Sequence, residues 1–139
     1  MALAGKLHPL LIHFPIALVI VAFASEMAAL ATADHRWRLV SIVTARAGAA
    51  SALVAVAAGW LLANALRMGG SALLTWHQWL GTAAAGLALA AALTSADAEG
   101  RPIRAAWIYR LALLAAAASV AAAAHLGGLL VWGADFLRP

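Results

Sequence analysis

Four long apolar runs constrain this chain more than any other feature of its sequence. They cover about residues 7–32, 37–66, 71–94 and 103–136, and short polar segments separate them. Each run exceeds the roughly 20 residues that an α-helix needs to cross a hydrocarbon core about 30 Å thick. Because lipid offers no hydrogen bonds to the backbone, such runs are predicted to be helical. We therefore expect an all-α integral membrane four-helix bundle of up-down-up-down topology, with residues 1–139 forming a single transmembrane domain.

Composition excludes most other classes of protein. Hydrophobic residues make up 66% of the chain, charged residues only 10%, and the mean hydropathy is +0.96, whereas soluble domains carry about 25% charged residues. The nine Lys and Arg residues give a net charge of +4, but they are scattered singly and form no patch for nucleic acid. The absence of cysteine excludes disulfides, thiolate metal sites and covalently attached c-type haem.

Basic residues at the two ends of the runs predict the orientation. One end of the expected bundle holds more basic residues than the other. The richer end has Arg36, Arg38, Arg101 and Arg104, and the other end has Lys6, Arg67 and Arg138. By the positive-inside rule the richer side is cytoplasmic. We therefore expect a multi-pass protein of the bacterial inner membrane with both termini in the periplasm.

Histidines are the main candidates for chemistry. His35 falls in the first polar segment and is expected to be a solvated loop residue. His8 and His13 open the first run, His77 lies early in the third, and His125 lies in the last third of the fourth. In an up-down-up-down bundle these four histidines converge on the outer face. Ionisable residues inside a membrane are costly and are candidates for functional sites.

The histidine pattern favours haem b as the cofactor. Bundle cores hold haem through histidines on facing helices, so His8, His13, His77 and His125 are predicted to be axial ligands of the iron of one or two haems. On a regular helix His8 and His13 lie roughly 140° apart, so the two cannot readily share one metal but can serve different haems. Several glycines would leave room for a flat cofactor: Gly59, Gly81, Gly127 and Gly128.

Bis-histidine ligation fills both axial positions, so an electron-transfer protein is favoured over a stand-alone enzyme. Its redox partner would be a quinone in the membrane or a periplasmic cytochrome. The chain is also expected to contact the lipid bilayer, and it could form a homo-oligomer. A copper or zinc site lined by three or four histidines, used for metal handling, is the first alternative. A non-catalytic membrane anchor or assembly subunit is the second.

Charged residues within the runs give two further expectations. Glu26 and Arg46 lie at similar predicted depths, which favours an ion pair between the first two helices that Arg110 could join. The interval from His13 to Arg46 also equals the interval from His77 to Arg110, as two related helix hairpins would produce.

The sequence resembles an uncharacterised bacterial membrane family, domain of unknown function 2231. The segment LHPLLIHFPIAL at residues 7–18 is similar to the opening His-Pro-x-x-x-His-Phe-Pro signature of that family. The WHQW segment around His77 and the HLGG segment from His125 are similar to its later motifs. The resemblance covers essentially the whole chain and implies four helices. The association of such domains with cytochrome-containing proteins implies a redox role by analogy.

Overall fold

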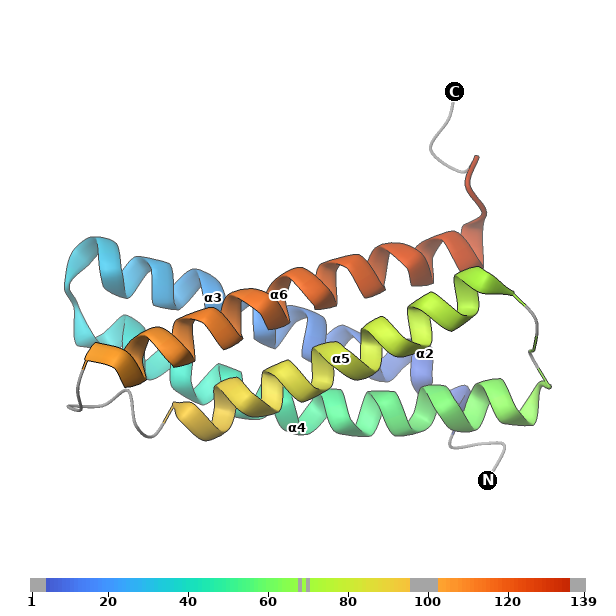
Figure 1. Cartoon of the computed structure of the whole chain (residues 1–139), viewed down its shortest axis with the longest axis horizontal. Helices are drawn as coiled ribbons and strands as arrows, with labels where there is room; N and C mark the ends of the chain where they lie inside the picture. Colours follow the sequence, from blue (N-terminus) through green and yellow to red (C-terminus); the bar gives the residue numbers. More distant parts are fainter. Residues whose placement is uncertain (1–4, 68, 70, 96–102, 136–139) are drawn as a thin grey trace.

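A computed structural model describes residues 5–67, 69, 71–95 and 103–135 of the chain. Four long helices form an antiparallel bundle in which each long helix packs against two neighbours (Figure 1). α3 and α5 lie diagonally, and α4 and α6 each contact both of them. The expected all-α bundle is therefore confirmed for the described residues. The helices, with a short additional one before the first, are α2 (His8–Leu11), α3 (His13–Thr32), α4 (His35–Ala65), α5 (Ala72–Thr94) and α6 (Ile103–Trp132).

The chain is a membrane protein by the length and polarity of its helices. Residues 8–32, α4 and α6 are each long and apolar enough to cross a membrane. α5 has 23 residues but is not among them, because polar residues around His77 lower its hydropathy. Large apolar side chains point outward, as with Val43 at 64% and Leu93 at 68% exposure. Such a surface requires lipid rather than water around it.

The first run forms two helical segments instead of the continuous helix expected over residues 7–32. Pro9 stands in the first turn of α2, where a missing N–H costs little. Pro15 has no N–H to donate to the carbonyl of Leu11, four residues earlier, so the hydrogen-bond ladder is interrupted there. α2 ends at Leu11 and α3 begins at His13, on either side of Ile12.

The turn between α3 and α4 is closed by side-chain capping. Asp34 has extended backbone angles, and its carboxylate accepts a 2.9 Å hydrogen bond from the N–H of Arg36. α4 therefore begins at His35, two residues before the expected start at Trp37. His35 lies in the first helical turn rather than in a loop, although its side chain is 82% exposed. At the other end of the chain α6 ends at Trp132, and the expected end near residue 136 lies outside the described residues.

Alanine dominates the core. Small residues let helix backbones approach closely, which is how helices associate in lipid. One buried cluster lies near the α3–α4 turn and contains Ala22, Ile42, Ala45, Ala91, Tyr109 and Leu113. A second cluster occupies the middle of the bundle and contains Val19, Ala49, Ala84, Ala88, Ala116 and Val120.

One buried carboxylate at the α3–α4 end holds two arginines. Glu26 is 0% exposed; Arg110 Nε donates to its Oε1 at 2.8 Å, and Arg38 Nε lies 2.7 Å from its Oε2. Arg46 instead donates through Nε to Ser95 Oγ at 3.0 Å. The expected Glu26–Arg46 pair is therefore wrong. Arg38 and Arg46 are eight residues apart, so they leave α4 in directions that differ by about 80°, and only Arg38 faces α3.

The cap at Asp34 gives a test of the fold. Replacing Asp34 with alanine is expected to lower the free energy of unfolding by about 1 kcal/mol, because the Arg36 N–H loses its acceptor. Titration with a denaturing detergent in mixed micelles measures this value. Asp34→Asn is the matched control, since it keeps an acceptor and should preserve most of the stability. An equal loss in both variants would assign the effect to the charge instead of the cap.

Candidate histidine site

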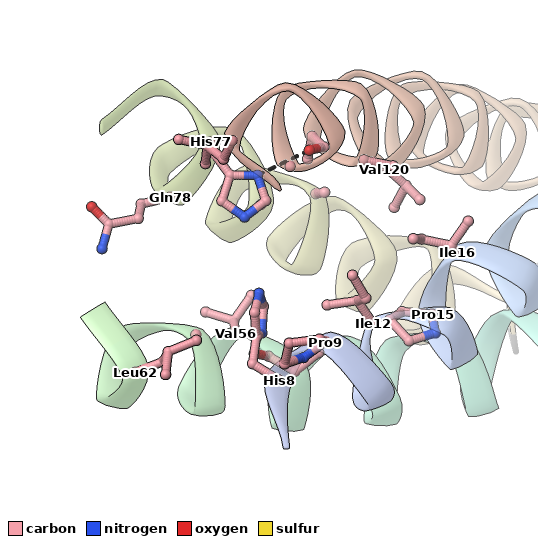
Figure 2. Close-up of a pocket in the computed structure, with 18 of the residues that line it drawn as sticks. His8, Pro9, Ile12, Pro15, Ile16, Val56, Leu62, His77, Gln78 and Val120 are labelled. Carbon is pink, nitrogen blue, oxygen red and sulfur yellow. Dashed lines mark hydrogen bonds between the residues drawn. The ribbon is translucent and has the colours of Figure 1, made fainter. Parts of the chain in front are cut away.

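His8 and His77 face each other at the end of the bundle where α4 connects to α5. Their ring centroids are 6.2 Å apart, and the ring planes meet at 76°. His8 comes from α2, which packs against α4, and His77 comes from α5, which packs against α6. Figure 2 shows the two rings pointing toward each other from opposite walls of a pocket. The two halves of the bundle thus contribute one histidine each to this histidine pair.

Each ring of the histidine pair is held by a backbone carbonyl of a neighbouring helix. His8 Nδ1 lies 2.9 Å from the carbonyl oxygen of Ala55, and His77 Nδ1 lies 2.9 Å from that of Ala123. A carbonyl oxygen can only accept, so Nδ1 carries the hydrogen in both rings. In the neutral ring Nε2 then keeps its lone pair. A carbonyl contact at one ring nitrogen is the usual arrangement for a histidine whose other nitrogen binds metal.

Two glycines make room for these rings. A Cβ atom at Gly59 would lie 2.9 Å from Cε1 of His8, and a Cβ atom at Gly127 would lie 3.0 Å from Cε1 of His77. Any side chain at either position would therefore press on an imidazole. Gly81 and Gly128 also line the pocket, but a Cβ atom there would meet nothing within 4 Å.

The histidine pair opens into an apolar pocket of about 580 Å³. This volume lies within the range of roughly 300–1,000 Å³ typical of ligand and cofactor sites. Figure 2 shows Ile12, Ile16 and Val120 bordering the same space beside the histidines. All parts of the bundle contribute to the lining, which includes Pro9, Ile12, Ile16, Ala52, Val56, Trp60, Leu74, Gln78, Gly81, Val120, Gly127 and Leu130.

Trp60 fixes one wall of this pocket. Its Nε1 donates to Thr82 Oγ1 at 3.1 Å, which links α4 to α5. Its ring meets Trp79 edge to face, with centroids 5.8 Å apart. The contact with Thr82 depends on the packing of two helices, so spacing along the sequence does not predict it.

The two halves of the site correspond in sequence position. His8 and His77 are 69 residues apart, while Ala55 and Ala123, like Gly59 and Gly127, are 68 apart. The same offset relates the cores of α4 and α6. Each of the five buried residues of α6 lies 68 residues after a buried residue of α4. The pairs are Ser41 and Tyr109, Ala45 and Leu113, Gly48 and Ala116, Ala52 and Val120, and Ala55 and Ala123.

This register identifies the equivalent histidines. The interval between His13 and Arg46 suggested that His13 corresponds to His77, but the contacts make His8 the equivalent of His77. The hairpin α2–α3–α4 and the hairpin α5–α6 are thus similar around the site.

The structure does not bring the other two candidate histidines to this pair. His13 lines the rim of the pocket with an exposed side chain, and its Nδ1 lies 3.3 Å from the carbonyl of Leu10. His125 is exposed and is absent from the pocket lining, because it follows Ala123 by two residues and leaves α6 in another direction. Among the described residues, no group of three or more His, Cys, Asp and Glu side chains could hold a metal ion.

The backbone partners of the histidines were not foreseen from the sequence. Ala55 and Ala123 act through their carbonyls, and an alanine gives no signal of such a role. A glycine four residues after each alanine is the only trace in the sequence.

A model of one protein family matches this chain. The family is described as a predicted membrane protein, DUF2231, and the match covers residues 5–136. None of the curated proteins matches the chain, and none of the solved structures does. The matched region contains both members of the histidine pair and all of the described helices. The chain therefore belongs to the DUF2231 family of predicted membrane proteins.

Proposed function

We propose that this protein is a b-type cytochrome that transfers electrons in the membrane, with His8 and His77 as the axial ligands of a single haem b. The 6.2 Å separation of the two rings carries the proposal. An imidazole nitrogen lies about 2 Å from the metal that it binds, and the ring centre lies about 1 Å farther away. Two imidazoles on opposite sides of one metal therefore have centres about 6 Å apart, which agrees with the separation of this pair.

The number of ligands favours haem over a protein-only metal site. Zinc, or a copper site of the kind lined by three or four histidines, takes three or four donors from side chains, whereas haem iron takes four nitrogens from the porphyrin and needs only two. The described residues supply two facing imidazoles and no larger cluster. The donor set thus fits haem better than it fits the histidine-lined copper or zinc site.

The surroundings of the histidine pair also fit a flat apolar group. The pocket of about 580 Å³ lies between the α2–α3–α4 hairpin and the α5–α6 hairpin. His8 and His77 would hold a haem from opposite walls of this space. Bound there, haem would supply reversible one-electron oxidation and reduction of its iron. The protein would position both imidazoles through Ala55 and Ala123, and its apolar side chains would exclude water.

The position of the pocket suggests the redox partner. Arg36, Arg38 and Arg104 lie near the starts of α4 and α6, at the opposite end of the bundle from the histidine pair, where the described basic residues are Lys6 and Arg67. If that basic end faces the cytoplasm, as the positive-inside rule proposes, the pocket lies toward the periplasm. A membrane quinone or a periplasmic cytochrome could then exchange electrons at the pocket.

The absorption spectrum and haem content of the purified protein test this proposal. The protein is expected to be red, with a sharp reduced α band of b type and a single haem per chain. His8→Ala and His77→Ala should each abolish low-spin bis-histidine haem, because each removes an axial ligand. His125→Ala is the matched control and should retain the wild-type spectrum, because His125 does not line the pocket.

A colourless protein with stoichiometric copper or zinc would contradict the haem proposal and support metal handling. A protein that binds neither group would favour the anchor or assembly role. Loss of haem in His125→Ala, with His8→Ala unaffected, would overturn the ligand assignment.

The glycines beside the rings give a second test. Gly59→Ala and Gly127→Ala are each expected to weaken haem binding by about tenfold, since the added methyl displaces an imidazole from its carbonyl. Haem titration of the apoprotein measures the affinity. Gly86→Ala is the matched control: it lies in α5 with nothing within 4 Å of the added atom and should bind haem as the wild type does. Equal affinities in all variants would show that the carbonyl contacts do not position the ligands.

A further inference from the structure

The end of the bundle opposite the histidine pair contains a second polar cluster. Glu26, Arg38 and Arg110, here called the arginine–glutamate triad, come from α3, α4 and α6. Glu26 is completely buried, while the side chains of Arg38 and Arg110 are 21% and 14% exposed. The carboxylate thus lies inside the bundle, and both arginine side chains are partly exposed.

The charges of the arginine–glutamate triad do not balance. One carboxylate faces two guanidinium groups, which leaves a net charge of +1. Arg46 adds a further positive charge nearby, since its contact among the described residues is the uncharged Ser95 hydroxyl. Among the described residues, Glu26 is the one carboxylate that pairs with Arg38 and Arg110. An anion bound at this surface would lower the cost of the remaining positive charge beside hydrocarbon.

The hydrogen bonds of the triad are also incomplete. Glu26 Oε2 and Arg38 Nε lie 2.7 Å apart, yet their alignment does not make a hydrogen bond, and both atoms are buried. Among the described residues, Arg38 and Arg110 both approach Glu26 through Nε. The two NH₂ groups of a guanidinium match the oxygens of a phosphate.

The triad lies at the depth of lipid headgroups. Arg38 is three residues from the start of α4, and Arg110 is seven residues from the start of α6. At 1.5 Å per residue these positions are about 5 and 10 Å inside the helix ends. Arg110 Cζ lies 5.2 Å from the ring centre of Trp107, whose side chain is 53% exposed. Exposed tryptophans mark the boundary between headgroups and acyl chains.

We propose that Arg38 and Arg110 bind the phosphodiester headgroup of an anionic membrane phospholipid. Basic pockets between transmembrane helices are typical sites for such headgroups. Glu26 holds the two guanidinium groups side by side and limits their mutual repulsion. This site is separate from the histidine pair, so it does not depend on whether the protein binds haem.

Native mass spectrometry of the purified protein with equal amounts of phosphatidylglycerol and phosphatidylcholine tests the proposal. The wild type is expected to retain phosphatidylglycerol preferentially. Arg38→Gln should reduce that preference by about fivefold, the effect expected for one arginine near a headgroup. Arg36→Gln is the control, since it removes the same charge from an exposed residue outside the triad and should lower the preference clearly less than Arg38→Gln does.

Glu26→Gln separates lipid binding from a purely structural ion pair. The substitution keeps the shape of the side chain and raises the charge of the triad to +2, so retention of phosphatidylglycerol should increase. An unchanged or weaker preference in Glu26→Gln would contradict the proposal. So would no lipid preference in the wild type, which can be judged even if Arg38→Gln fails to fold.

Two further outcomes would overturn the site. Equal losses in Arg38→Gln and Arg36→Gln would indicate general attraction to a basic surface. Displacement of the lipid by inorganic phosphate, added as a competitor, would assign the site to a free anion. Retention of the lipid under that competition supports a headgroup site.

Discussion

The short distance between helices, which alanine permits, is the constraint on which the rest of this structure depends. Lipid supplies no hydrophobic force between helices, so close backbone packing has to hold the bundle together. The same closeness lets an imidazole of one helix reach a carbonyl of the next, as His8 reaches Ala55 and His77 reaches Ala123. It also requires Gly59 and Gly127, because the rings occupy the space of a methyl group at those positions.

The two ends of the bundle solve opposite problems with the same pair of hairpins. Near α2 each hairpin contributes a neutral ring, a carbonyl and a glycine, so the two halves correspond closely. At the other end the correspondence fails: Glu26 on α3 is matched, 69 residues later, by Ser95 at the C-terminal cap of α5. Glu26 contacts two arginines, whereas Ser95 accepts from one, Arg46, and donates its own hydroxyl to the Ala92 carbonyl. A symmetric pair of histidines and an asymmetric charged cluster thus arise from one architecture.

Hydropathy was enough to predict the four long helices, although not the interruption at Ile12, since a run of 20 or more apolar residues has one stable conformation in lipid. Partner choice was harder to predict. Depth along the helix axis suggested Arg46 as the ion-pair partner of Glu26. The observed partner on α4 is Arg38, because its side chain leaves the helix on the side that faces α3. Likewise, four histidines near one face suggested four ligands, while only His8 and His77 meet. Which side of a helix a residue occupies depends on tertiary packing and on the interruption before Pro15, and periodicity is faint where every face is apolar.

The origin of the histidine pair has a thermodynamic consequence. His8 and His77 belong to different hairpins, so their 6.2 Å separation exists only when the hairpins are docked. A group that binds both rings therefore binds the assembled bundle and not its separated halves, and binding stabilises the assembly by mass action. The carbonyl contact of each ring, by contrast, lies within its own hairpin. Each hairpin thus orients its own histidine, and the packing of the two hairpins brings the histidines together.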